Sequence, residues 1–277
     1  MEQLPRLKAR IASLNELRDL IRALRAMAAS RVQEAQGALA GIRRYAEMVE
    51  RAIAENATLL GDQARSVRPE PVEKKVLITV CSEHGFTGAF NDRLIDRARA
   101  ELTPGTALGI IGRRGAALAE EAHLKVDWDA AMATHIGGVP LVARRVADRL
   151  DDVTTARVVF ATYQSGGQYE IVARDILPLD PALLKASASA GPPLHQLDPF
   201  LLLQRLSNEY LFGEITRAIM ESLASENGAR LQVMSAADHN IGDKLETLGR
   251  QHHHLRQEAI TAELLDVVTG AEAVSTS

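Results

Sequence analysis

The sequence predicts an α/β protein in which a long antiparallel coiled coil of N- and C-terminal helices carries an inserted Rossmann-like α/β domain. Three observations predict this class. Both ends of the 277-residue chain carry apolar residues at helical spacing with almost no proline. Between them, short apolar runs alternate with amphipathic segments, as in a mainly parallel sheet with helices on its faces. Neither end can bury its apolar seam alone, so we expect the two helices to pair, and the inserted domain makes that pair antiparallel.

The N-terminal helix is expected over residues 1–60. Its apolar residues recur at steps of three and four, a period near 3.5, which is typical of a coiled-coil seam. The predicted seam positions are Leu7, Ile11, Leu14, Leu17, Ile21, Leu24, Ala28, Val32, Ala35, Leu39, Ile42, Ala46, Val49 and Ile53. A polar, proline-bearing stretch, residues 61–73, ends the helix.

The inserted domain is expected over residues 74–180, the size of one ordinary domain. Its predicted strands are Val76–Val80, Ala107–Ile111, Leu124–Trp128, Val158–Tyr163 and Tyr169–Leu177. Its predicted helices are Asp92–Leu102, Arg114–Ala122 and Val139–Asp151.

A loop rich in Ala, Ser, Gly and Pro, residues 180–199, leads to the C-terminal helix, expected over residues 200–273. Its seam positions are Ile241, Leu245, Leu248 and Leu255, with His252 at one expected apolar position. Three glycines, Gly228, Gly242 and Gly249, weaken the helix locally and allow bends.

The composition of the chain argues against several classes of function. Hydrophobic residues make up 46% of the chain, charged residues 25%, and the formal net charge is -4, so the whole chain gives no case for nucleic-acid binding. Residues 1–51 are nevertheless basic, with ten Lys or Arg against six Asp or Glu. The single cysteine excludes an internal disulfide. No apolar run approaches the roughly 18 to 20 residues that cross a bilayer and no signal-peptide pattern opens the chain, so we expect membrane association only through a partner.

The stretch CSEHGFTGAFND, residues 81–92, is the candidate active site. It follows a predicted buried strand and precedes a helix, and it holds a thiol at Cys81 with His84 three residues on. The chain has no phosphate-binding loop, no dinucleotide fingerprint and no nucleophile elbow. A lone cysteine that ends a buried strand is usually an inert small hydrophobe. A stand-alone α/β enzyme, dimerised through its long helices, therefore remains the minor alternative.

Two charged patterns lie on the terminal helices. In HHHLR, residues 252–256, adjacent side chains point about 100° apart, so the three histidines cannot share one metal. Arg18, Arg22 and Arg25 lie on one helix face beside the seam. They form either a solvated face or a docking stripe for an acidic protein surface or a phosphate backbone. A nucleic-acid-binding basic helix is a third, minor interpretation.

The end of the chain, RQEAITAELLDVVTGAEAV, places an apolar face at the tip of a very long helix. Leu264, Val267, Val268 and Ala271 make this face. Such a tip frays unless something encloses it, so it either bends back onto its own chain or is surrounded by other subunits.

These residues together resemble the gamma subunit of F-type ATP synthases. The C-terminal signature of that family is matched by Ile260-Thr261-x-Glu263, Asp266 and Gly270-Ala271, with Arg256-Gln257 ahead of it. Residues 8–36 look like its N-terminal helix, SEHGFTGAFN resembles its S-D-x-G-L-x-G-x-x-N turn, and residues 225–240 resemble its return helix. The resemblance runs nearly end to end.

The chain also departs from the family pattern, as a divergent member. Leu20-Ile21-Arg22-Ala23-Leu24 stands where I-T-x-A-M is usual. In the turn, Glu83 replaces Asp and Phe86 replaces Leu. Residues 252–254 replace a more typical Tyr-Asn-Lys.

The resemblance implies a central rotor shaft of an ion-translocating F-type ATP synthase or ATPase, itself without catalytic, cofactor or metal site. It implies three alpha and three beta subunits around one such chain, an epsilon subunit and a membrane ring of c subunits at its foot, and a peripheral location on the cytoplasmic side of the cell membrane. The residues that match ring-facing positions are Arg22, Leu24, Arg25, Arg256, Gln257, Thr261 and Glu263. Tyr210 and Glu214 match positions near the foot.

Overall fold

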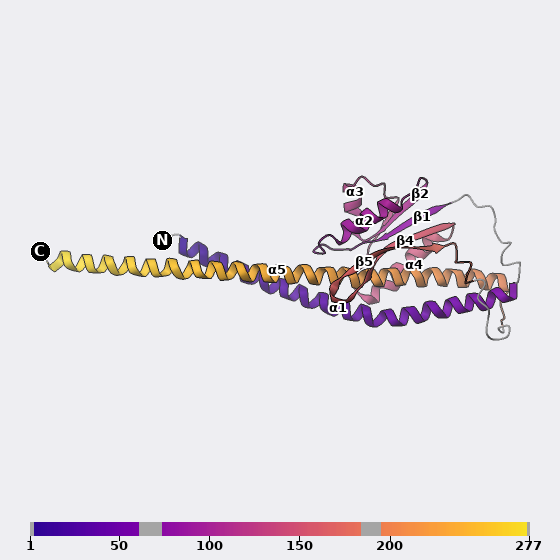
Figure 1. The fold of residues 1–277 in the computed structure, drawn as a ribbon, viewed down its shortest axis with the longest axis horizontal. Coiled ribbons are helices and arrows are strands. Elements are labelled where there is room, and N and C mark those ends of the chain that lie inside the picture. Colours follow the sequence, from indigo (N-terminus) through magenta and orange to yellow (C-terminus); the bar gives the residue numbers. More distant parts are fainter. Residues whose placement is uncertain (1–2, 61–73, 184–194, 276–277) are drawn as a thin grey trace. The chain divides into compact units, whose positions relative to one another are not determined.

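The computed structural model describes residues 3–60, 74–183 and 195–275 (Figure 1). The chain divides into two compact units. The two-helix unit joins residues 1–27 with 232–277, and the sheet unit holds residues 28–231. Helix α1 (Gln3–Leu60) and helix α5 (Pro199–Ser275) each contribute to both units. The predicted stretch 61–73 and most of the predicted loop 180–199 lie outside the described residues.

In the two-helix unit, the N-terminal part of α1 lies against α5. Ile21 of α1 and Met234 and Leu248 of α5 are buried, and the predicted α5 positions Ile241 and Leu245 are half-buried. Leu17 was wrongly predicted to lie in the seam, because its side chain is 44% exposed. Arg18 points towards α5 instead, where its guanidinium contacts Asp238 at 2.9 Å.

In the sheet unit, polar contacts between the same two helices define an antiparallel pair. Arg43 reaches Glu221 at 3.1 Å, the Tyr45 hydroxyl donates to Glu209 at 2.6 Å, and the Asn56 amide donates to the Pro199 carbonyl at 2.9 Å. As numbers rise along α1, their partners fall along α5. The predicted seam here is confirmed, since these residues are buried: Ala28, Val32, Ala35, Leu39, Ala46, Val49 and Ile53.

The sheet has five strands in the order β3-β2-β1-β4-β5. They are β1 (Lys75–Val80), β2 (Thr106–Ile111), β3 (Trp128–Ala130), β4 (Thr155–Tyr163) and β5 (Tyr169–Leu177). The first four are parallel and β5 is antiparallel to β4. The predicted class, a mainly parallel sheet between two long terminal helices, is therefore confirmed.

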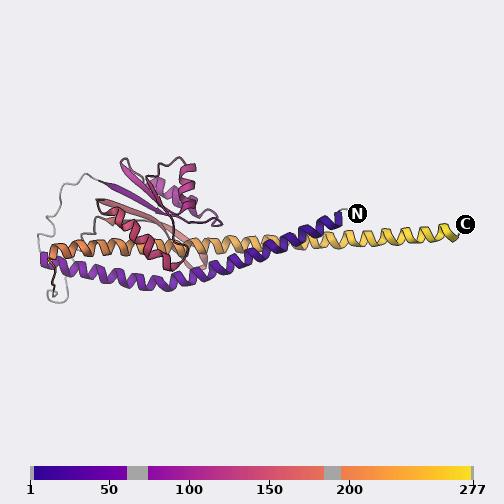
Figure 2. The same cartoon turned by 180° about the vertical axis from the view of Figure 1, so that it is seen from behind.

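Helices cover both faces of this sheet (Figures 1 and 2). Alternate side chains of a strand point to opposite faces. Val76, Ile78 and Val80 of β1 therefore pack with α4 (Val139–Ala147) and the sheet-unit parts of α1 and α5, while Leu77 packs with α2 and α3. Helix α2 spans Phe90–Glu101 and α3 spans Arg113–Glu121. Because β1 and β2 are buried on both faces, their sequences are nearly continuous apolar runs instead of alternating ones.

The third predicted strand, Leu124–Trp128, is wrong except at its last residue. Strand β3 begins at Trp128. Ahead of it, the Asp127 N–H donates to the Leu108 carbonyl at 2.9 Å, but the Leu108 N–H donates to the Asp127 carboxylate at 2.8 Å. A side chain thus takes the place of the backbone acceptor that a strand would offer, and regular pairing starts one residue later.

Throughout the described part of the chain, no helix carries an apolar stretch long enough to cross a membrane.

Candidate coupling and partner-binding sites

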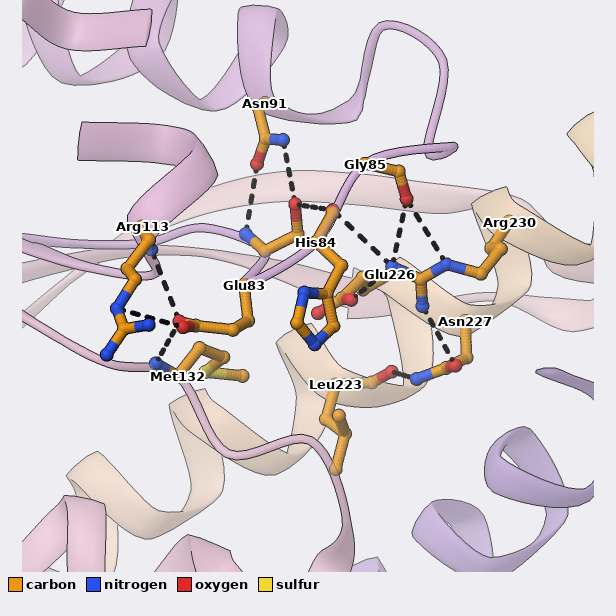
Figure 3. Close-up of polar contacts among 11 residues, drawn as sticks. Glu83, His84, Gly85, Asn91, Arg113, Met132, Leu223, Glu226, Asn227 and Arg230 are labelled. Atoms are coloured by element: carbon orange, nitrogen blue, oxygen red, sulfur yellow. Dashed lines mark hydrogen bonds and ion pairs between the residues drawn. The ribbon is translucent and has the colours of Figure 1, made fainter. Parts of the chain in front are cut away.

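The turn between β1 and α2, residues 81–89, lies at the carboxyl ends of the parallel strands, where α/β proteins commonly bind ligands. Its second residue, Ser82, is hydrogen-bonded to α2. The Ser82 N–H donates to the Asn91 side-chain oxygen at 2.9 Å, the Asn91 amide donates to the Ser82 hydroxyl at 2.8 Å, and that hydroxyl donates to the His84 carbonyl at 2.8 Å (Figure 3). This ring of hydrogen bonds fixes the turn where it leaves the sheet.

Glu83 ties the same turn to two further segments. Its carboxylate accepts hydrogen bonds from the Met132 N–H at 2.8 Å and the Arg113 N–H at 3.2 Å, and it lies 3.3 Å from the Arg113 guanidinium. Figure 3 shows this carboxylate between the start of α3 and the segment that follows β3. The Glu83 side chain therefore ties the turn to two further segments at one edge of the sheet.

The catalytic interpretation of this turn depends on Cys81, and the structure does not favour it. The Cys81 side chain is fully buried. Helix α3 packs on it so closely that a Cβ added to Gly115 would lie 2.5 Å from its sulfur. Burial, with a smaller contribution from the Glu226 charge, raises the pKa of the Cys81 thiol, while His84 lies exposed. A buried, protonated thiol is a poor nucleophile.

Helix α5 contacts the turn through a buried ion pair. Arg230 of α5 donates to Glu226 at 2.6 Å, to the Asn227 side-chain oxygen at 3.1 Å and to the Gly85 carbonyl at 3.2 Å (Figure 3). Arg230 is 8% exposed and Glu226 4%. Burial raises the pKa of the Glu226 carboxyl, and the adjacent Arg230 opposes that shift. Sequence reasoning missed this pair, whose only local signal is its i,i+4 spacing.

The predicted arginine stripe converges on a single carboxylate of the two-helix unit. Arg18, Arg22 and Arg25 lie 2.9, 3.2 and 3.1 Å from Asp238. The hydrogen bond from Arg18, with the charges of the three arginines, holds the pKa of the Asp238 carboxyl below its usual range. Three guanidiniums against one carboxylate leave two surplus positive charges. Both Arg22 and Arg25 keep more than 40% of their side chains exposed, so they remain open to a further anionic partner.

Near the C-terminus, the four predicted ring-facing residues Arg256, Gln257, Thr261 and Glu263 are all exposed. The Thr261 hydroxyl donates to the Gln257 carbonyl at 2.9 Å, which uses one of its hydrogen bonds inside the helix. Beyond them, Leu264, Val267 and Val268 are exposed by 61%, 70% and 53%. Asp266, Gly270 and Ala271, which complete the family signature, lie outside the described side chains.

The two predicted foot residues are buried in the sheet unit. Tyr210 is 6% exposed and Glu214 3%. Glu214 lies 3.2 Å from the Arg174 guanidinium of β5 and 3.9 Å from that of Arg217. Burial raises the pKa of Glu214, and burial together with the Glu214 charge raises the pKa of Tyr210 to about 12.

The histidines near residue 252 are not brought together with other metal-ligating groups. His252 and His253 meet edge to face with ring centres 6.0 Å apart, and His254 lies 3.4 Å from Glu258. Within the described residues, no group of three or more His, Cys, Asp or Glu side chains is arranged to hold a metal ion.

Two long terminal helices, paired antiparallel, and a five-stranded α/β unit make up the fold. Solved structures share this fold. A chain of the Euglena gracilis mitochondrial ATP synthase, from a structure of OSCP, F1 and c-ring in rotational state 3, aligns with a TM-score of 0.67 at 13% identity, covering 99% of this chain and 95% of that one. A chain of the Tetrahymena thermophila central stalk and c-ring aligns with a TM-score of 0.59 at 15% identity, covering 79% and 99%.

The chain belongs to the ATP synthase family, whose model matches residues 3–274. Among its relatives, the ATP synthase gamma chain of Synechococcus sp. (strain JA-3-3Ab) is 29% identical over an alignment of 318 positions, which covers 99% of this chain and all of that one. The gamma chain of Rhizorhabdus wittichii is 28% identical with the same coverage. Within the family the chain is of the gamma type, a non-catalytic subunit with the role of a rotor shaft.

Proposed function

We propose that this chain turns inside a hexamer of three alpha and three beta subunits and couples its rotation to ATP synthesis or hydrolysis in that ring. An epsilon subunit and a membrane ring of c subunits would hold its foot on the cytoplasmic side of the cell membrane. Ion flow through the membrane ring turns the shaft, and the asymmetry of the shaft drives each beta subunit through open and closed states in sequence.

The observation that carries this proposal is the exposed apolar tip of α5. Leu264, Val267 and Val268 are more than half exposed near the C-terminal end of α5. Exposed apolar surface of this kind marks a contact with another protein. Small and aliphatic side chains fit a sleeve in which a shaft can turn, because they offer no deep interlocking contacts.

The ring-facing polar residues fit the same arrangement. Arg256, Gln257, Thr261 and Glu263 precede the apolar tip and are exposed, as contacts with a surrounding ring require. In the two-helix unit, Arg22 and Arg25 carry surplus positive charge beside the half-buried Leu24, which suits acidic loops of the beta subunits.

The foot contacts are indirect in this proposal. Since Tyr210 and Glu214 are buried, they would act by holding Arg174, whose side chain is 39% exposed and ion-paired with Glu214. Arg174, on the edge strand β5, would then present its free donors to a partner.

The test is to tag this chain in its own cells, solubilise the membranes gently, and measure the stoichiometry and ATPase activity of what co-purifies. We expect three alpha and three beta subunits for each copy of the chain, together with epsilon and c subunits. Recovery of the chain alone or as a homodimer would contradict the proposal. Turnover by that isolated chain, dependent on Cys81 or His84, would then favour the enzyme alternative.

A further inference from the structure

Helix α5 makes hydrogen bonds directly to the backbone of two neighbouring strands. The Ser222 hydroxyl donates to the Val80 carbonyl of β1 at 3.2 Å and accepts from the Ala161 N–H of β4 at 3.1 Å. One turn later, the Ser225 hydroxyl donates to the Ala161 carbonyl at 3.1 Å. Both serines are fully buried or nearly so, at 1% and 0% exposure. Two short side chains thus bring the helix backbone against the carboxyl ends of β1 and β4.

Residues of α5 before and after the two serines also contact the carboxyl-terminal edge of the sheet. Ahead of them, the Glu221 carboxylate accepts from the Tyr163 N–H of β4 at 3.3 Å and lies 3.1 Å from the Arg43 guanidinium of α1. Beyond them, Arg230 donates to the Gly85 carbonyl of the β1–α2 turn, with Glu226 beside it. Between Ser225 and Arg230, Gly228 leaves space for the Tyr163 ring, which would lie 2.8 Å from an added Cβ.

This edge is the topological switch point of the sheet. From β1 the chain continues to β2 on one side, and β4 lies on the other, so the crevice between β1 and β4 is where such sheets bind their ligands. Here α5 occupies it. Its polar side chains pair with Val80, Ala161, Tyr163 and Gly85, the backbone groups that a ligand would otherwise contact.

We propose that Ser222, Ser225 and Arg230 form a polar lock that fixes the sheet of this unit to α5 at one register, and that torque passes between them through this lock. The inference rests on the proposed function, because it assigns a part of the shaft to the transmission of torque. Ser222, Ser225 and Arg230 are positioning residues, since they act through the strand ends and the turn.

The need for a lock follows from the rest of the interface. Leu211, Ile215, Ile219 and Leu223 of α5 join the apolar cluster beneath the sheet. Apolar burial is non-directional, so it holds two surfaces together without fixing one register. Hydrogen bonds are directional, and a slip of one helical turn would leave the buried Val80 and Ala161 carbonyls without their partners. Buried ion pairs add little net stability against apolar replacements, which favours a role in register for Glu226 and Arg230.

The lock is tested in the purified membrane complex, sealed in lipid vesicles. The measurement is the membrane potential that ATP hydrolysis builds, divided by the rate of hydrolysis, because this ratio reports coupling whichever cation is moved. We expect Arg230→Gln, and separately Ser222→Ala with Ser225→Ala, to leave hydrolysis near the wild-type rate while the ratio falls roughly three- to tenfold.

Two further variants separate torque transmission from ordinary stability. Arg230→Lys keeps a cation beside Glu226 and one donor for the turn, so it should restore a large part of the ratio. Arg157→Gln is the matched control: Arg157 is held by Glu101 of α2 and by Asp175 of β5. Loss of the Arg157 charge weakens the sheet unit at a place away from α5. The ratio of membrane potential to hydrolysis rate should therefore stay at the wild-type value.

A wild-type ratio in both lock variants would overturn the inference. So would an equal loss in Arg157→Gln, since the effect would then be one of stability alone. If Arg230→Gln fails to assemble, the serine pair decides, because it removes two hydroxyl groups and no charge. Failure of the proposed function has a different signature, namely that the wild-type chain is not recovered with ring subunits at all.

Discussion

Asp238 is the residue on which three arginines of the other helix converge in the two-helix unit. Its pKa is depressed by the hydrogen bond from Arg18 and by the charges of Arg22 and Arg25. A carboxyl whose folded pKa lies below its unfolded value contributes stability above the unfolded pKa, and loses that contribution as the pH falls through the folded pKa. The ion cluster should therefore stabilise the unit at neutral pH and cease to do so in acid.

Asp238→Asn tests this directly. At pH 7 the substitution should lower the Tm of the isolated chain by a few degrees, because three guanidiniums lose their counter-ion. The difference from wild type should shrink as the pH falls below the usual range of an aspartate pKa, because the wild-type carboxyl itself then becomes protonated. Thermal unfolding followed by circular dichroism measures both.

The matched control for this substitution is Asp243→Asn, on the same helix. Asp243 is exposed and its ion-pair partner is the exposed His239 at 3.7 Å. The Tm of the Asp243→Asn chain should therefore differ little from that of wild type at either pH. An Asp238→Asn chain as stable as wild type at pH 7 would show that the cluster contributes nothing to stability.

At the scale of the element, α5 shows that the effect of a glycine in a helix depends on what packs against it, which the sequence does not show. The predicted effect of Gly228, Gly242 and Gly249 was local weakening, yet α5 is continuous from Pro199 to Ser275. At two of the three glycines, the missing side chain lets another side chain pack close to the helix backbone. Gly228 admits the Tyr163 ring, and Gly242 admits the Arg18 guanidinium, which would lie 3.2 Å from an added Cβ. Gly249 has open space around it.

Alanine substitutions at two of these glycines should therefore change the free energy of unfolding in opposite directions. Gly249→Ala should stabilise the chain by about 0.5–1 kcal/mol, since alanine has the higher helix propensity and meets nothing. Gly228→Ala should destabilise it by about 1–3 kcal/mol, because the added methyl group displaces Tyr163 from a packed position. Urea unfolding of the two variants gives both values. Stabilisation by Gly228→Ala would show that the Tyr163 ring moves aside at no cost.

The elements that sequence reasoning could find are those with a local pattern. A period near 3.5 predicted the buried seam from Ala28 to Ile53, and short, largely apolar segments predicted β1, β2, β4 and β5 within three residues at each end. Two predictions were wrong because a polar side chain makes a contact that the apolar pattern does not show. Leu17 fits the seam period, but Arg18 is drawn towards Asp238, and the Asp127 side chain replaces a strand acceptor ahead of β3.

At the scale of the whole molecule, the antiparallel pairing of the terminal helices followed from the need of each to bury a seam. The polar lock did not follow from anything in the sequence. Ser222 and Val80 are 142 residues apart, and Arg230 and Gly85 are 145 apart, so no spacing connects them. The serines of ESLASENGAR, residues 221–230, look like ordinary polar positions of a helix, and only the folded sheet shows that they are buried.

The residues that should matter only in the assembled complex are those exposed near the C-terminus. Arg256 and Gln257 are exposed, so Arg256→Ala with Gln257→Ala should leave the unfolding free energy of the isolated chain within about 0.5 kcal/mol of wild type. In the membrane complex, assembly or coupling should be impaired. Ion-driven ATP synthesis should fall about tenfold or more, as expected when contacts worth roughly 1.4 kcal/mol are lost.

Arg250→Ala with Gln251→Ala supplies the control for this last variant, because it removes the same two side-chain types from exposed positions of the same helix, less than two turns earlier. It should leave ATP synthesis nearly unchanged. Equal losses in the two double variants would mean that charge along the helix matters and the particular contacts do not. Unchanged synthesis in the Arg256 and Gln257 variant would remove both residues from the ring-facing surface, and would leave the apolar tip alone to carry the contact with the ring.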